Sequence, residues 1–150
     1  MYYNALPGWH YNQPNDAGKY CDLPSEPLYA FGEGLSYTTF TYEGMRFNPE
    51  TMHLSVRVTN AGERRGRETV QVYFRDCVSS VLTPVKQLIA FKQVELEAGE
   101  SAEVEFSLNR MDFSLVNRYE ERVVEPGEFV LMAGHSSKEE DLLSIRFALK

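Results

Sequence analysis

The sequence predicts an all-β protein, a two-sheet sandwich of about seven strands preceded by an irregular N-terminal arm. Three observations support this prediction. Apolar and polar residues alternate with period two in several runs after residue 38, turns rich in Gly, Pro and Asn separate the runs, and no window of ten or more residues keeps the apolar spacing of a helix. A chain of 150 residues, 43% of them hydrophobic, is large enough to bury one core without metals or disulfides.

Residues 1–38 form the predicted arm or interdomain linker, and residues 39–150 form the predicted sandwich. Four of the seven prolines lie before residue 38, and proline disfavours both helices and paired strands because it lacks an N–H and fixes φ. Large aromatic side chains are costly to leave in water, so we expect the arm to pack on another surface. Its aromatic residues are Tyr2, Tyr3, Trp9, Tyr11, Tyr20, Tyr29, Phe31 and Tyr37.

The seven predicted strands follow in order along the rest of the chain. The third run places Val70, Val72 and Phe74 toward the core, and its polar set, which includes Gln71 and Tyr73, toward solvent. One helical turn is possible near residues 109–115. The strands cover residues 39–47, 51–59, 69–75, 87–96, 101–108, 129–133 and 143–149. Seven short strands in this space indicate an immunoglobulin-like or fibronectin type III-like sandwich, although the Cys…Trp…Cys pattern of a true immunoglobulin domain is absent.

Composition excludes several classes of partner. A net charge of −7 and a pI near 5.0 argue against nucleic-acid binding, and the basic cluster at residues 63–67 has the pattern of a solvated turn. No apolar run approaches the roughly 18–20 residues of a membrane span, and the first residues do not resemble a signal peptide. We therefore expect a soluble chain without a membrane partner. The compartment stays open, with the cytoplasm favoured for a parent enzyme, and Cys21 and Cys77 are expected to be free thiols.

No arrangement of residues in the sequence predicts catalysis. His10, His53 and His135 lack zinc-site spacing, and there is no nucleophile elbow, phosphate loop or dinucleotide-binding glycine pattern. The carboxylates are abundant, but they lie beside turns or on outward strand positions, as solubilising surface charge does. We therefore expect no catalytic residue, no metal and no cofactor.

A resemblance to a known family rests on an ordered series of short segments. Residues 26–40 read Glu26-Pro27-Leu28-Tyr29-Ala30-Phe31-Gly32-Glu33-Gly34-Leu35-Ser36-Tyr37-Thr38-Thr39-Phe40. This run resembles the P-L-x-x-F-G-x-G-L-S-Y-T-x-F segment of family 3 glycoside hydrolases, the β-glucosidases, β-xylosidases and their relatives. Segments similar to the family follow in the same order at residues 56–62 with Gly66, 70–73, 84–94, 96–101, 124–129 and 134–137.

The resemblance implies a non-catalytic accessory role. In that family the residue 26–40 segment links the catalytic domains to a C-terminal fibronectin type III-like domain, so the implied partners are the catalytic domains of a parent β-glucosidase-like enzyme, in cis. The catalytic motifs of those domains are absent from this chain. The residues expected to make the interdomain contact are Tyr29, Phe31, Gly32, Gly34, Leu35, Ser36 and Tyr37.

Two alternatives stay open from the sequence. Tyr29, Phe31 and Tyr37 could plug one end of the sandwich, with or without a contact to another domain. The chain could also be an independent carbohydrate-binding module, in which aromatic rings of the arm stack on sugars. The candidate stacking residues are Trp9, Tyr2, Tyr3 and Tyr11.

Overall fold

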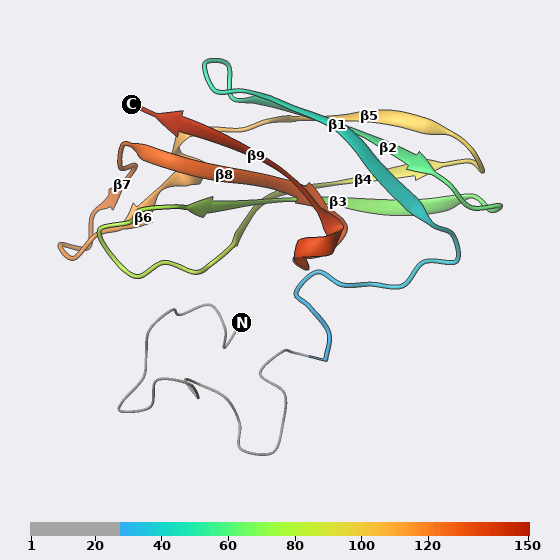
Figure 1. Cartoon of the computed structure of the whole chain (residues 1–150), viewed down its shortest axis with the longest axis horizontal. Coiled ribbons are helices and arrows are strands. Elements are labelled where there is room, and N and C mark those ends of the chain that lie inside the picture. Colours follow the sequence, from blue (N-terminus) through green and yellow to red (C-terminus); the bar gives the residue numbers. More distant parts are fainter. Residues whose placement is uncertain (1–27) are drawn as a thin grey trace.

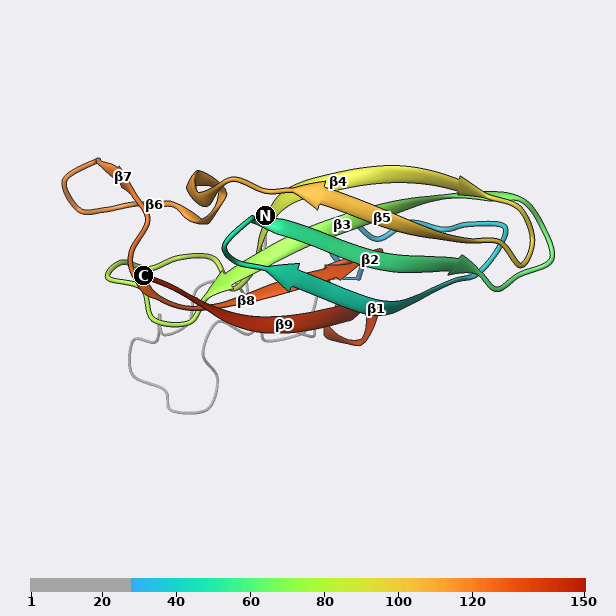
Figure 2. The ribbon, with the colours of Figure 1, turned by 90° about the horizontal axis from the view of Figure 1, so that it is seen from above.

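A computed structural model describes residues 28–150 as an all-β sandwich. One sheet has the strand order β1-β2-β5 and the other has the order β4-β3-β8-β9, with antiparallel pairing throughout (Figures 1 and 2). The strands are β1 (Phe40–Asn48), β2 (His53–Asn60), β3 (Gly66–Asp76), β4 (Gln87–Leu96), β5 (Ser101–Ser107), β8 (Gly127–Gly134) and β9 (Leu142–Leu149). Each lies where the sequence predicted a strand, so the predicted fold class is confirmed.

Two 3-10 helices and a short hairpin complete the part of the chain that the structure describes. The 3-10 helix η2 (Arg110–Phe113) lies where one helical turn was expected, and Asn109 caps it by accepting a hydrogen bond from the Met111 backbone N–H at 2.9 Å. A two-stranded hairpin of β6 (Leu115–Val116) and β7 (Arg122–Val123) follows, which the sequence did not predict. The 3-10 helix η3 (Glu139–Asp141) lies in the connection between β8 and β9.

The core lies between the two sheets and follows the predicted alternation. Val56 and Val58 of β2 and Val70 and Val72 of β3 are fully buried, and Phe113 of η2 closes one part of the core among other phenylalanine rings. Its ring centroid lies 5.3–6.5 Å from those of the rings it touches, which are Phe47, Phe74, Phe129 and Phe147. Such contacts are the usual geometry of packed aromatic side chains.

The turn after β2 is built around the side chain of Asn60. Asn60 is fully buried, yet its side chain is satisfied: Nδ2 donates to the carbonyls of Arg64 and Leu96, and Oδ1 accepts from the Gly62 N–H and the Thr38 hydroxyl. A buried amide without these partners would destabilise the fold. The end of the arm is therefore attached to the sandwich at Thr38.

Candidate functional site

The outer face of β3 differs from the prediction. Gln71 and Tyr73 were expected to face solvent, but they are only 7% and 1% exposed. That prediction was wrong because the arm packs on this face at Phe31 and Gly32. Met132 of β8, which is paired with Tyr73 in the sheet, is also buried but lies outside the central core cluster. The sandwich thus has a second, smaller buried layer beneath the arm.

The arm makes a tight turn on this face, at residues 30–33, which we call the arm turn. Gln71 holds the arm turn, because its Nε2 donates to the Gly32 carbonyl at 2.8 Å and to the His135 carbonyl at 2.6 Å. Its Oε1 accepts a 2.5 Å hydrogen bond from the Tyr73 hydroxyl. The Phe31 ring packs edge-on against Tyr73 with centroids 6.4 Å apart. One buried glutamine therefore joins the arm to the end of β8.

Gly32 fits the arm turn for two reasons. Its backbone φ of +76° is a conformation that residues other than glycine rarely adopt. A Cβ atom at this position would also lie 1.9 Å from Gln71 Oε1. A side chain at Gly34 would meet nothing within 4 Å. The close approach of the arm backbone to β3 thus needs glycine at Gly32 but not at Gly34.

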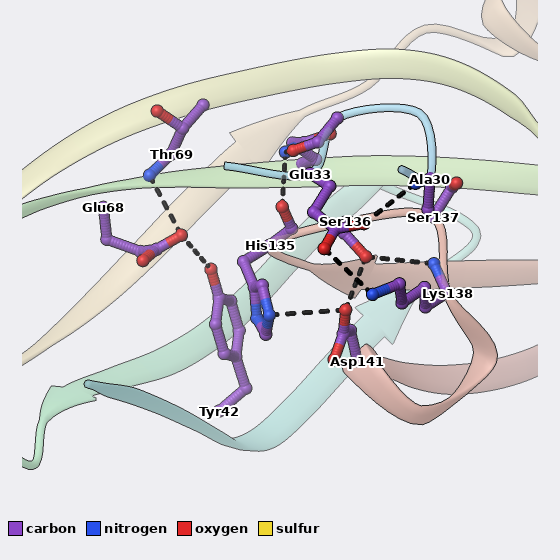
Figure 3. A network of polar contacts seen from close by, with 12 residues as sticks. Ala30, Glu33, Tyr42, Glu68, Thr69, His135, Ser136, Ser137, Lys138 and Asp141 are labelled. Atoms are coloured by element: carbon purple, nitrogen blue, oxygen red, sulfur yellow. Dashed lines mark hydrogen bonds and ion pairs between the residues drawn. The ribbon is translucent and has the colours of Figure 1, made fainter. Parts of the chain in front are cut away.

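The connection between β8 and β9, residues 135–141, also contacts the arm turn. We call it the β8–β9 loop. The Ser137 N–H donates to the Phe31 carbonyl at 3.0 Å, and Lys138 Nζ lies 3.0 Å from a Glu33 carboxylate oxygen (Figure 3). The second Glu33 oxygen accepts a 2.8 Å hydrogen bond from the Ala30 N–H. The Ala30 N–H and the Lys138 ammonium hold the pKa of the Glu33 carboxyl below its usual value of 4.5.

A second polar group lies beside the arm turn (Figure 3). His135 Nε2 is 3.3 Å from Asp141 Oδ2, and the same oxygen accepts a 2.5 Å hydrogen bond from the Ser136 hydroxyl. The Tyr42 hydroxyl donates to Glu68 at 3.0 Å, and burial together with that carboxylate raises the pKa of Tyr42 above its usual range. The contacts of His135 and Ser136 with Asp141 lie within the β8–β9 loop, whereas that of Tyr42 with Glu68 joins β1 to β3. Within residues 28–150, no group of three or more His, Cys, Asp or Glu side chains is placed to hold a metal ion.

The predicted contact residues of the arm divide into anchored and exposed positions. Phe31 and Gly32 are anchored against β3, and the Ser36 hydroxyl accepts a hydrogen bond from the Thr38 N–H. Leu35 and Tyr37 are 99% and 94% exposed, and Leu28 and Tyr29 are also largely exposed. Tyr29 and Tyr37 therefore do not plug the end of the sandwich, and Phe31 packs on the outer face of a sheet.

Other sequence expectations have simpler outcomes. Arg65 of the basic cluster is exposed and pairs with Glu95 and Glu97 at 3.1 and 3.4 Å, as a solvated turn would. Cys77 is a free thiol. The proposed stacking residues Trp9, Tyr2, Tyr3 and Tyr11, together with His10 and Cys21, lie outside the described residues. Among the helices of residues 28–150, none has the length and apolar character needed to cross a membrane.

The residues that sequence reasoning missed are Gln71, Tyr73 and Lys138, which hold the arm turn. Gln71 and Tyr73 occupy the polar phase of a regular alternation, and Lys138 follows a glycine and serine turn, so local pattern gives no sign of a partner. The only available signal was the arm itself, whose aromatic residues needed a surface on which to pack.

Comparisons with known proteins agree with this fold. Residues 68–137 match the family described as the fibronectin type III-like domain. A β-xylosidase of Formosa agariphila is 39% identical over 139 residues, which is 89% of this chain and 19% of that protein. A periplasmic β-glucosidase of Salmonella typhimurium is 37% identical over 147 residues, which is 91% of this chain and 19% of that protein.

The same match extends to solved structures. A Listeria innocua β-glucosidase crystallised with glucose superposes with a TM-score of 0.83 at 35% identity, covering 99% of this chain and 22% of that structure. This chain thus spans about a fifth of the length of its relatives, a small non-catalytic share of each. The chain belongs to the fibronectin type III-like domains that family 3 glycoside hydrolases of the β-glucosidase and β-xylosidase type carry.

Proposed function

We propose that this chain is the accessory domain of a family 3 glycosidase, of β-glucosidase or β-xylosidase type, and that it packs in cis on the catalytic domains and stabilises them. In this proposal residues 1–38 are the linker and contact segment, and residues 39–150 are the sandwich that holds it. The contact residues are the seven predicted in the arm, from Tyr29 to Tyr37.

One observation carries the proposal, which is the combination of a fixed backbone with exposed apolar side chains. Gln71, Ser137 and Lys138 hold the arm turn at defined positions, while Leu35 and Tyr37 immediately after it project almost fully into solvent. Exposed aromatic and aliphatic residues that are held in place contribute strongly to an interface, because little conformational entropy is lost on binding. The relatives that match the chain are β-glucosidases and β-xylosidases about five times its length. This length supports a partner domain in the same polypeptide.

The proposal is tested by expressing the catalytic domains with and without residues 1–150. We expect the shorter protein to have a lower Tm and reduced hydrolysis of an aryl β-glucoside or β-xyloside, because it loses a packed apolar contact. Equal Tm and equal activity would contradict the proposal.

A matched pair of double variants locates the contact. Leu35→Ser with Tyr37→Ser removes exposed apolar side chains of the arm. Val116→Ser with Tyr119→Ser removes less exposed apolar side chains, 59% and 66% exposed, from the β6–β7 hairpin at the far end of the sandwich (Figure 1). In the full-length enzyme, the arm variant should lower Tm and the hairpin variant should not. A larger loss from the hairpin variant would place the contact elsewhere.

A further inference from the structure

The outer surface of β4 continues the surface formed by the arm. In the β3–β4 pairing, Leu88 lies opposite Tyr73 and Phe91 lies opposite Gln71, so both side chains point to the outer face. We call these two residues the β4 patch. Tyr73 and Gln71 are the residues on which the arm turn rests, so the β4 patch lies directly beside the arm.

The β4 patch is exposed in this chain. Phe91 is 67% exposed and Leu88 is 38% exposed, on a strand that forms the edge of its sheet. Exposed apolar side chains on an edge strand are unfavourable in water, and natural proteins usually cover such side chains. Here the residues in register on β3 are covered by the arm, but the two on β4 are not.

The opposite outer face of the sandwich has a different character. On the β1-β2-β5 sheet, Arg57 lies between Glu43 and Glu103 in the strand register, and the Thr59 and Ser101 hydroxyls are 2.8 Å apart. These are cross-strand pairs of a surface that faces water. The two outer faces are therefore unequal, with apolar residues concentrated on the face that carries the arm.

We infer that the β4 patch and the arm form one docking surface, and that the catalytic portion of the same polypeptide covers both while the β1-β2-β5 sheet stays in solvent. The inference rests on the proposed function and adds to it the orientation of the sandwich. Its partner is an apolar surface in cis, since the β4 patch is continuous with the arm and the arm leads into the rest of the polypeptide in the proposed enzyme. A surface of this kind buries Leu88 and Phe91 without requiring any charged partner.

Site-resolved thiol labelling tests the inference. In a background of Cys21→Ser and Cys77→Ser, three single variants are made: Phe91→Cys on β4, Tyr37→Cys on the arm and Glu103→Cys on β5, an edge strand of the opposite sheet. The rate at which a maleimide labels each cysteine is measured by mass spectrometry, in the 150-residue chain and in the full-length enzyme. We expect cysteines at 91 and 37 to react at least about tenfold more slowly in the full-length enzyme, and the cysteine at 103 to react equally in both.

The outcomes separate this inference from the proposed function. Protection at 37 without protection at 91 would overturn the inference and leave the proposed function standing. Protection at neither position would overturn both, and protection at 103 would reverse the inferred orientation.

A second measurement does not depend on cysteine chemistry. Phe91→Thr keeps a side chain suited to a strand, and it should lower the Tm of the full-length enzyme while leaving that of the 150-residue chain nearly unchanged. Glu103→Thr is the matched control and should have no such differential effect. Equal effects of Phe91→Thr in the two proteins would overturn the inference.

Discussion

At the scale of single residues, Gly32 and Gln71 decide how the arm meets the sandwich. Gln71 uses both ends of its amide, and Gly32 provides the backbone conformation and the space that the amide requires. An alanine at Gly32 has to displace either the buried amide or the backbone of the arm. The packing of the arm turn on β3 therefore requires that residue 32 has no Cβ atom.

Gly32→Ala should therefore destabilise the 150-residue chain by about 1–3 kcal/mol, from strain at positive φ together with the steric overlap at Gln71. Gly34→Ala is the matched control two residues away, with open space around the added methyl group, and it should change the free energy of unfolding by no more than about 0.5 kcal/mol. Urea denaturation of both variants measures the difference. Equal effects would show that the arm turn does not depend on the close approach.

At the scale of elements, the β8–β9 loop and the arm turn stabilise each other through Glu33. The carboxylate accepts the Ala30 N–H and pairs with Lys138, and both interactions favour its ionised form. A carboxyl whose pKa is lowered by folding contributes stability that is fully present above the pKa of the unfolded chain. That contribution is lost as the pH falls through the lowered pKa of the folded chain.

Glu33→Gln removes the charge and keeps an oxygen that can accept from Ala30, so it isolates the ionic contribution. The wild-type chain should be more stable than this variant above pH 4.5, and the difference should shrink as the pH falls further. Asp76 and Glu125, whose pKa values are also shifted, titrate in both proteins and cancel in the comparison. Urea denaturation across this pH range measures the difference in free energy of unfolding between the two proteins. A difference that stays constant with pH would contradict the ionic contribution of Glu33.

Sequence patterns predicted the long strands but not the features that leave no pattern of apolar and polar residues. β2, β3 and β5 were predictable because a half-buried strand imposes period two on its own residues. The other four strands were predicted from less regular apolar runs between turns. The β6–β7 hairpin was not, since strands of two residues contain no period. The burial of Gln71 and Tyr73 was missed because their cover comes from a segment about forty positions earlier, whose irregular backbone leaves no periodic trace. The arm residues were found through family resemblance, whereas Lys138 could be found only in three dimensions.

At the scale of the whole molecule, the aromatic residues of the core differ from those of the proposed docking surface. Phe113 and its neighbouring rings fill the space between the sheets, while Phe91 lies on the outside of β4. The two sets are distinguished by their burial, since Phe113 is buried and Phe91 is mostly exposed.

Phe113→Ala should cost the 150-residue chain about 3–5 kcal/mol, because it leaves a cavity among packed rings. Phe91→Ala should cost the same chain no more than about 1 kcal/mol, since the side chain is already mostly in water. Chemical denaturation of the two variants gives both values. A cost at Phe91 as large as that at Phe113 would mean that β4 belongs to the core.

The hydrogen bonds of the arm turn also set the order in which the chain can fold. Gln71 lies 39 positions after Gly32, and Lys138 lies 105 positions after Glu33, so the arm leaves the ribosome well before its partners exist. Contacts between such distant positions form late, because closing the intervening loops costs entropy that must be offset by structure already made. The arm turn is thus synthesised before the strands that hold it, and Phe31 and Gly32 reach their final positions only once β3 and the β8–β9 loop have assembled.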